Sequence, residues 1–127
     1  LLDPSRLREV RAVMSRHVGV VRDELSLASA AGALGSIART MRTAKRGAGD
    51  EASVDEGPPR PEPSRRTWEA TNILTVATAM VAAAAARTES RGCHRRSDHP
   101  SPRPEWVRHL DVTLDAAGTI DVRDRPS

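Results

Sequence analysis

Apolar residues in the first part of the chain recur at steps of three and four, the spacing of one face of an α-helix. A first set comprises Leu7, Val10, Met14, Val18, Val21 and Leu25. A second set comprises Leu27, Ala31, Leu34, Ala38 and Met41. Gly19 and the charged run 22–24 interrupt the pattern, and Asp23 is a candidate N-cap for the second helix. The pattern predicts a helix pair over residues 1–44.

The periodicity stops at residue 45 and resumes after residue 64. Residues 45–64 are Gly, Pro, Ser and charged residues, with Val54 as the one sizeable apolar side chain, so we expect a disordered linker. Ser64 or Thr67 then caps a predicted long helix over 65–90, whose Ala-rich body allows neighbouring backbones to approach closely. We expect this helix to be the central one of the bundle.

The last part of the chain changes to a period of two. Gly92 is a predicted helix stop, and a proline-punctuated loop follows over 91–106. Residues 107–125 hold two alternating runs joined by "DAAG", which is typical of a β-hairpin. The predicted fold class is mainly α: a single domain, 1–127, built as a spectrin-repeat-like three-helix bundle with a C-terminal β-hairpin.

Composition limits how stable this domain is by itself. The chain has 127 residues, and Trp68 and Trp106 are its only aromatic residues, so the core is aliphatic and thin. We therefore expect it to lean on a partner domain, and its start at Leu1 rather than Met suggests a module of a longer protein. A single cysteine favours a cytoplasmic location. The apolar run 73–86 is too short and too Ala-rich to span a bilayer, so no membrane partner is expected.

The segment "ESRGCHRRSDHP", residues 89–100, concentrates the candidate chemistry. Possible metal ligands in and near it are Cys93, His94, Asp98, His99 and His109. No Cys-x-x-Cys or His-x-x-x-His pair is present to build a tetrahedral site, so we predict no metal site. Cys93 also lacks a base at a recognisable spacing for a thiol nucleophile. We predict no catalytic and no cofactor-binding residue in the chain.

Arginines surround the same segment, but acids alternate with them and no stacking aromatic lies among them. The formal net charge is only +3, so we expect no nucleic-acid partner. Docking against another protein domain is the remaining role, because arginine makes forked, charge-assisted bonds. The predicted domain-interface residues are Arg91, His94, Arg96 and Asp98. Two alternatives remain open: Arg91, Arg96 and Asp98 form an internal salt-bridge set, and His94 is a hydrogen-bonded structural histidine.

The string "RTESRGCHRRSDHP", preceded by an Ala-rich helix and followed by "WVRHL", resembles the carboxy-terminal helical domain of the succinate dehydrogenase and fumarate reductase flavoprotein family. Within that family the chain is most similar to the L-aspartate oxidase branch. The opening "LREVRAVMSRHVGVVRDELSLASAAGAL" is similar to the first helix pair of that domain. Arg95 and His99 depart from the pattern, because the family commonly has aromatic residues there.

The resemblance implies a helical domain that packs on a larger FAD-binding domain and its capping domain. Those two domains are the implied partners, and FAD is the implied cofactor of the parent enzyme, bound outside this chain. The implied parent oxidises L-aspartate to iminoaspartate in NAD biosynthesis, and this chain alone is expected to have no activity. The alternatives are the same domain of a succinate dehydrogenase or fumarate reductase flavoprotein subunit, and a free-standing helical interaction module.

Overall fold

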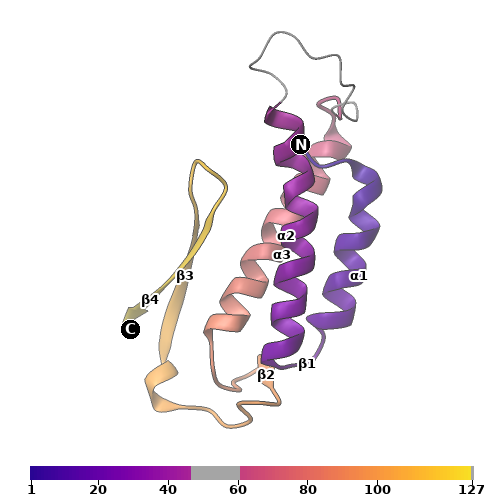
Figure 1. The fold of residues 1–127 in the computed structure, drawn as a ribbon. Helices are drawn as coiled ribbons and strands as arrows, with labels where there is room; N and C mark the ends of the chain where they lie inside the picture. The colour runs from indigo at the N-terminus through magenta and orange to yellow at the C-terminus, as the bar shows by residue number, and fades with distance from the viewer. Residues whose placement is uncertain (47–60, 127) are drawn as a thin grey trace.

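The computed structural model describes residues 1–46 and 61–126, so most of the predicted linker, 45–64, lies outside the described residues. The described residues form three α-helices and four β-strands, with two short 3₁₀ helices (Figure 1). In chain order they are η1 (Pro4–Arg6), α1 (Leu7–His17), β1 (Val21–Arg22), α2 (Glu24–Arg46), α3 (Arg65–Ala86), β2 (Arg95–Arg96), η2 (Pro104–Trp106), β3 (Arg108–Leu114) and β4 (Ile120–Pro126).

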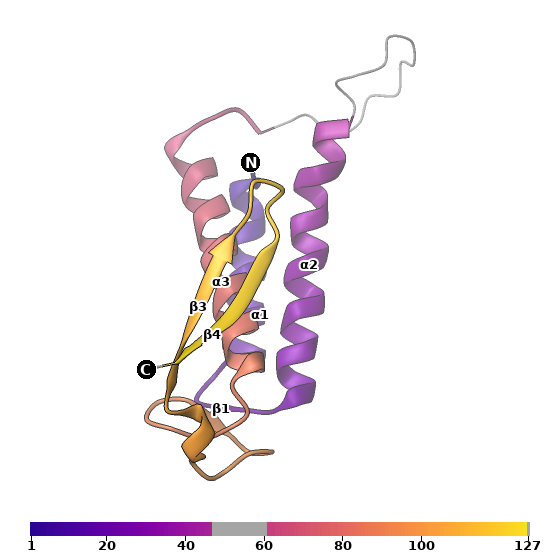
Figure 2. The ribbon, with the colours of Figure 1, turned by 90° about the vertical axis from the view of Figure 1, so that its left-hand side faces the viewer.

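The helices α1, α2 and α3 run side by side with alternating directions, and the hairpin of β3 and β4 runs along α3 (Figures 1 and 2). The predicted mainly α fold, a three-helix bundle with a C-terminal hairpin, is confirmed. The α1–α2 turn and the loop after α3 lie at the same end of the bundle. This end contains the segment that carries the candidate chemistry.

Both predicted helix caps are formed. The Asp23 carboxylate accepts the Ser26 backbone N–H at 2.7 Å at the start of α2. At the start of α3, the Ser64 hydroxyl accepts the Thr67 backbone N–H at 3.2 Å, and the Thr67 hydroxyl accepts the Ser64 N–H at 2.8 Å. This reciprocal capping box satisfies two backbone donors that a helix N-terminus otherwise leaves unpaired.

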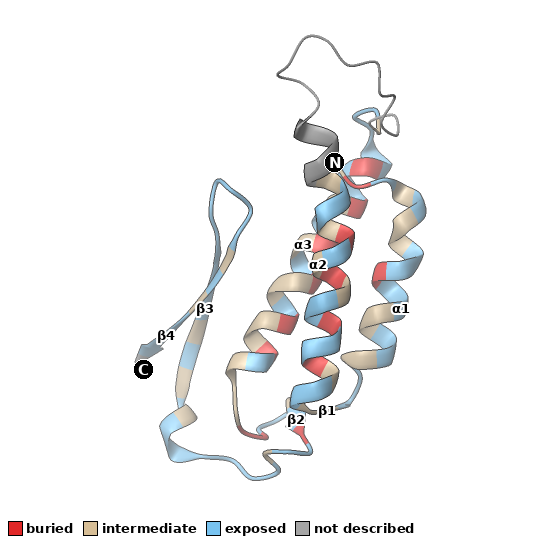
Figure 3. Cartoon of the chain, in the orientation of Figure 1, coloured by how far each residue is buried: buried red, intermediate tan, exposed pale blue. Residues whose placement is uncertain are grey.

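The core lies along the inward faces of the three helices (Figure 3). Its buried members are Leu2, Val10, Ala30, Leu34, Ile37, Ala70, Leu74, Ala77 and Val81. Small residues of α3 face Leu, Ile and Val of its neighbours, which keeps the helices close. Two residues of the predicted first stripe are placed differently: Val21 is 64% and Leu25 80% exposed, because α1 ends at His17 and the chain turns before either residue.

The end of α3 also differs from its prediction. The helix stops at Ala86 rather than at residue 90, and Arg87, with extended backbone, is its C-cap. Gly92 does not stop the helix. It has φ 57° within a tight turn in which Arg91 and His94 exchange backbone hydrogen bonds at 2.9 and 3.0 Å, a conformation that glycine adopts without strain.

The hairpin follows the predicted alternation. Its register pairs Val112 with Val122 and Leu114 with Ile120, so the apolar residues of both strands share one face. Gly118, with φ 82°, closes the turn. The first residues of the hairpin connect directly to the loop after α3.

Among the described helices, α3 is long and apolar enough to cross a membrane by length and composition alone. It is longer than the apolar run 73–86, so the length argument against a membrane does not hold for the whole helix. A core helix of a soluble protein meets the same criterion, and only 28% of the most apolar window of α3 is buried. The absence of a membrane partner stays a prediction.

The thin core makes single large side chains important. Leu34 on α2 is completely buried, and we expect Leu34→Ala to lower the free energy of unfolding by about 2–5 kcal/mol through lost burial and a residual cavity. Leu25→Ala, on the same helix but exposed, is the matched control and should change it by less than about 0.5 kcal/mol. Urea unfolding followed by circular dichroism measures both. Equal effects of the two substitutions would contradict this core.

Candidate functional site

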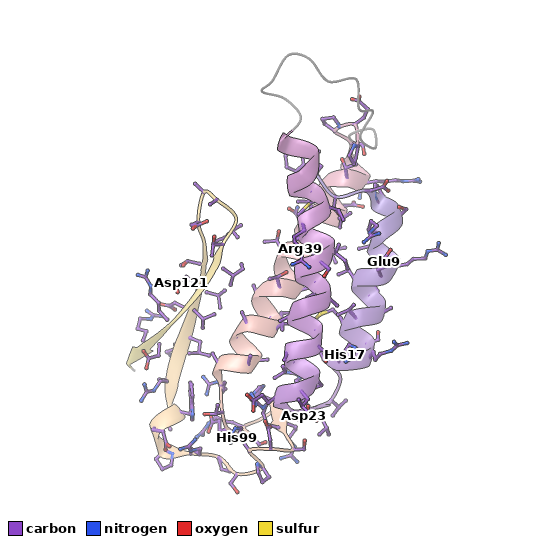
Figure 4. All side chains as sticks on the ribbon, in the orientation of Figure 1. Glu9, His17, Asp23, Arg39, His99 and Asp121 are labelled. Atoms are coloured by element: carbon purple, nitrogen blue, oxygen red, sulfur yellow. The ribbon has the colours of Figure 1, made fainter. Side chains whose placement is uncertain are left out.

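The motif loop, which we define as residues 87–106, is attached to the α1–α2 turn. β1 and β2 pair in parallel, with Val21 opposite Arg95 and Arg22 opposite Arg96. The Ser97 backbone N–H also donates to the Arg22 carbonyl at 2.8 Å. Asp23 and His99 accordingly lie close to the same end of the bundle (Figure 4). Segments more than seventy residues apart in the sequence are thus fixed against each other.

Arg96 and Asp98 connect two helix ends. The Arg96 side chain is only 3% exposed. Its guanidinium donates to both Asp98 oxygens at 2.8 and 2.6 Å, and to the carbonyls of Ala84 and Ala85 at 3.2 Å each. Asp98 in turn accepts the backbone N–H of Glu24 at 3.0 Å. The cation therefore lies at the C-terminus of α3 and the anion at the N-terminus of α2, the arrangement that both helix dipoles favour.

The Asp98 carboxylate is held in its charged form by these contacts. The hydrogen bond from Arg96 is the largest cause, and the Glu24 N–H adds to it, so the pKa of Asp98 lies well below its usual range. Burial acts in the opposite direction but does not prevail. The pair stays ionised over the whole neutral range.

Glu89 is the second centre of the motif loop. Its side chain is fully buried and accepts from Arg87 at 2.7 Å, from Arg91 at 2.9 and 3.2 Å, and from the Arg103 backbone N–H at 2.8 Å. These donors, with the Arg91 hydrogen bond as the largest cause, lower the pKa of Glu89 to about 2. A buried carboxylate is tolerated only when it is fully paired, and here four donor groups pair it.

Arg87 carries the network on to the hairpin. Its guanidinium donates to the carbonyl of Trp106 at 2.9 Å and to that of Arg108 at 2.8 Å. It also lies 5.4 Å from the centroid of the Trp106 ring, within cation–π range. The Trp106 indole N–H donates to the Thr88 hydroxyl at 3.1 Å. One arginine thus fixes where β3 begins relative to the end of α3.

His94 is neutral and its tautomer is defined by its neighbours. Nδ1 lies 3.3 Å from an Arg22 guanidinium nitrogen, which can only donate. Nε2 lies 3.0 Å from the Arg87 carbonyl oxygen, which can only accept. The ring therefore carries its proton on Nε2. Burial, with smaller contributions from the charges of Arg22, Arg96 and Arg87, lowers the pKa of His94 below its ordinary value.

The structure brings all four predicted interface residues together in the motif loop. Each of them makes contacts within the domain. These contacts agree with the two alternatives stated above, in which Arg91, Arg96 and Asp98 form internal ion pairs and His94 is a hydrogen-bonded structural histidine. Arg91 keeps 44% of its side chain exposed and Asp98 27%, whereas Arg96 is buried. Their role at a domain interface stays a prediction.

Two important residues of the site were not among those predicted. Glu89 and Arg87 organise the loop, and the signal that points to them is an acid flanked at two residues on either side by Arg87 and Arg91, directly after an apolar helix. Cys93 is exposed and forms no disulfide. In the described ranges 1–46 and 61–126, no three His, Cys, Asp or Glu side chains come together in a way that would hold a metal ion.

Comparison with known proteins identifies the family. The family model described as "Fumarate reductase flavoprotein C-term" matches residues 7–126. The chain belongs to this family. It is 39% identical over 123 residues to an L-aspartate oxidase of Streptomyces coelicolor, a match that covers 96% of the chain and 20% of the relative. An L-aspartate oxidase of Mycobacterium leprae is 33% identical over 107 residues, covering 84% of the chain and 16% of the relative.

The comparisons also reach the other enzymes of the family. A succinate dehydrogenase flavoprotein subunit of Rickettsia felis is 41% identical over 59 residues, 46% of the chain and 10% of the relative. The E. coli quinol fumarate reductase FrdA with an E245Q mutation has the same fold, with a TM-score of 0.68 at 19% identity over 98% of the chain and 21% of that protein. The chain therefore spans about a fifth of the length of the relatives that it matches most fully.

A flavin dinucleotide does not fit the described residues. Such cofactors bind where a strand of a parallel sheet leads through a glycine-rich turn into a helix. The sheets of the described part are the two-residue pair β1–β2 and the antiparallel hairpin. The turn from β1 into α2 contains Asp23, whose carboxylate already occupies the helix N-terminus together with that of Asp98. No step of flavin chemistry is assigned to these side chains.

We expect Glu89→Gln to destabilise the fold strongly, because it removes a buried charge and leaves its arginine donors incompletely paired. The folding equilibrium constant should fall by at least about tenfold. Glu105→Gln, in the exposed Arg103–Glu105 pair, is the control and should have little effect. Urea unfolding at neutral pH compares them. Similar midpoints for both variants would show that Glu89 does not organise the loop.

His94 makes stability depend on pH in a defined window. Its pKa is lower in the folded state than the ordinary value of 6.5, so the unfolded chain takes up a proton first as the pH falls. Stability is therefore full above about pH 6.5 and decreases as the pH falls below it. The carboxylates of Glu89 and Asp98 add their own loss only below their unfolded values of 4.5 and 3.8.

Urea midpoints between about pH 7 and pH 5 test this assignment. His94→Gln keeps an N–H for the Arg87 carbonyl but cannot be protonated, so its midpoint should change less over this range than that of the unaltered chain. His109→Gln, exposed on β3, should retain the full pH dependence. The assignment is wrong if the two variants behave alike.

Proposed function

We propose that this chain is the C-terminal support domain of an FAD-dependent L-aspartate oxidase, the enzyme that converts L-aspartate to iminoaspartate in NAD biosynthesis. The observation that carries the proposal is the 39% identity to the Streptomyces coelicolor enzyme over 96% of the chain. The parent enzyme binds FAD in a domain outside the described residues and acts in the cytoplasm. The chain contributes no catalytic residue of its own.

The contacts of the motif loop favour a structural rather than a catalytic role for this chain. Three of the loop's titratable groups are engaged in hydrogen bonds: Glu89 with two arginines, Asp98 with Arg96, and His94 through both ring nitrogens. A general base needs a free lone pair that substrate can reach, and a nucleophile needs an activating neighbour. The groups instead hold one end of a bundle rigid, which suits a surface that packs against the FAD-binding and capping domains.

A second assignment has its own observation. The 41% identity to the Rickettsia felis succinate dehydrogenase flavoprotein subunit extends over 46% of the chain, so the same domain of a succinate dehydrogenase or fumarate reductase flavoprotein is the runner-up. The L-aspartate oxidase assignment is preferred because its match extends over almost the whole chain.

A domain exchange tests the proposal. In a chimaera, this chain replaces the matching fifth of the Streptomyces coelicolor L-aspartate oxidase. We expect the purified chimaera to retain flavin and to oxidise L-aspartate, at a rate within about tenfold of the unaltered enzyme, because the transplanted domain supplies only packing. The readouts are flavin absorbance per protein and the rate of L-aspartate oxidation, with succinate as the competing substrate.

Two controls make the result interpretable. The enzyme truncated before the matching segment should lose flavin, which shows that the segment is needed at all. A second chimaera, in which the matching segment of the Rickettsia felis subunit is placed in the same Streptomyces coelicolor enzyme, tests specificity. The L-aspartate oxidase assignment would be overturned if the chimaera with this chain is soluble but holds no flavin while the chimaera with the Rickettsia felis segment does. That outcome would favour a free-standing interaction module.

A further inference from the structure

A groove with an apolar lining runs between α1 and α3, on the side of α3 away from the hairpin. Its volume is about 540 Å³. The α1–α3 groove, as we name it, is lined by Val10, Arg11, Met14, Ser15, Asn72, Ile73, Val76, Ala77 and Met80. None of these residues belongs to the motif loop, and the ion-pair network does not use them.

Three apolar residues along this groove, all on α3, are left largely exposed by the described residues. Ile73 is 37%, Val76 57% and Met80 52% exposed, and their spacing of three and four places them on one stripe of α3. The core residues Leu74 and Val81 lie on a different face of the same helix. α3 therefore has two apolar faces, and this second face contributes to the low buried share of its most apolar window. A surface helix of an isolated domain normally presents polar residues there.

The rim of the groove is polar and defines what fits it. Arg11 and Ser15 of α1 lie along one side and Asn72 of α3 along the other. The Arg11 side chain has no ion-pair or hydrogen-bond partner in the described part of the chain. The groove thus suits a ridge of apolar side chains with a carboxylate opposite Arg11. A lipid bilayer suits it less well, because Arg11 and Asn72 would be taken out of water together with the apolar stripe.

We propose that the α1–α3 groove is a second surface, beside the motif loop, on which the remainder of the flavoprotein docks, through an apolar ridge that carries an acidic residue opposite Arg11. The inference rests on the proposed function. The relatives that match the chain most fully extend about five times its length, so the partner surface is on the same polypeptide. A covalently linked partner acts at an effective concentration of about millimolar, which favours it over a second copy of the domain.

The groove adds to the motif loop a contact of a different kind. The charges of the loop are mostly paired within the domain. They can orient a docked partner, but they add little to the free energy of docking. Burial of Ile73, Val76 and Met80 supplies the apolar centre that stable interfaces have. The groove also explains how a domain with so thin a core is stable in its parent, because the partner covers α3 on its remaining open face.

The test introduces a charge into the groove within the chimaera described above. Val76→Glu should leave the thermal unfolding of the separate chain nearly unchanged, because the residue is exposed there. In the chimaera, the glutamate is buried against apolar atoms, and flavin retention after gel filtration should fall at least about tenfold. Leu25→Glu is the control: Leu25 lies on α2 outside the groove and is still more exposed than Val76, at 80% against 57%, so this variant should retain flavin.

Accessibility gives a second measurement that does not depend on flavin. In a Cys93→Ser background, Ser15→Cys at the rim should react with a maleimide rapidly in the separate chain and at least about tenfold more slowly in the chimaera. Arg11→Glu should weaken flavin retention by a smaller factor than Val76→Glu, since it reverses one charge at the rim.

Each outcome separates the two proposals. If the chimaera with the unaltered chain fails to hold flavin, the proposed function fails. If that chimaera holds flavin while Val76→Glu has no effect and Ser15→Cys reacts equally fast in both contexts, the groove faces solvent and the inference is overturned. Sedimentation of the separate chain as a dimer that Val76→Glu converts to a monomer would likewise overturn it, in favour of a second copy as the occupant.

Discussion

The ion pair of Arg96 and Asp98 is the constraint on which the rest of the domain depends. The guanidinium lies against the last carbonyls of α3, and the carboxylate lies against the first free N–H of α2. Both helix ends carry unpaired backbone groups and partial charges of opposite sign, and one ion pair satisfies both. Because the pair lies on the motif loop, it also fixes the loop relative to the bundle, so helix packing and loop position are set together.

A second network extends this rigidity to the hairpin. Glu89 gathers Arg87, Arg91 and the backbone of Arg103 around one buried carboxylate, and Arg87 continues to the carbonyls at the start of β3. Each donor group in this set is already engaged, so its atoms are positioned and not free for proton transfer. The chemistry-rich appearance of the segment 89–100 is therefore compatible with a domain whose contribution is mechanical.

The sequence predicted the elements of this fold well where a local signal existed. Asp23 and Ser64 are residues whose side chains cap helices by short-range geometry, and the alternation of β3 and β4 is equally local. The end of α3 was misplaced because Gly92 carries the same helix-stop signal as a C-cap glycine, whereas the helix ends earlier, where Arg87 turns towards the hairpin. The partners of Arg96 and Glu89 depend on contacts across the bundle, which spacing along the chain does not encode.

The exposed apolar stripe on α3 shows where prediction from the sequence pattern fails, and the failure is itself informative. Apolar residues all round an Ala-rich helix predict burial, and the prediction of a central helix follows, yet the domain covers only part of that surface. A helix that is apolar on more faces than its own domain covers is typical of a surface that contacts another domain or protein. In a family whose members extend far past this segment, the simplest source of that surface is the rest of the same polypeptide. In the docking proposed above, the stripe of Ile73, Val76 and Met80 would be buried inside the larger protein, which is why these residues are exposed in the described domain.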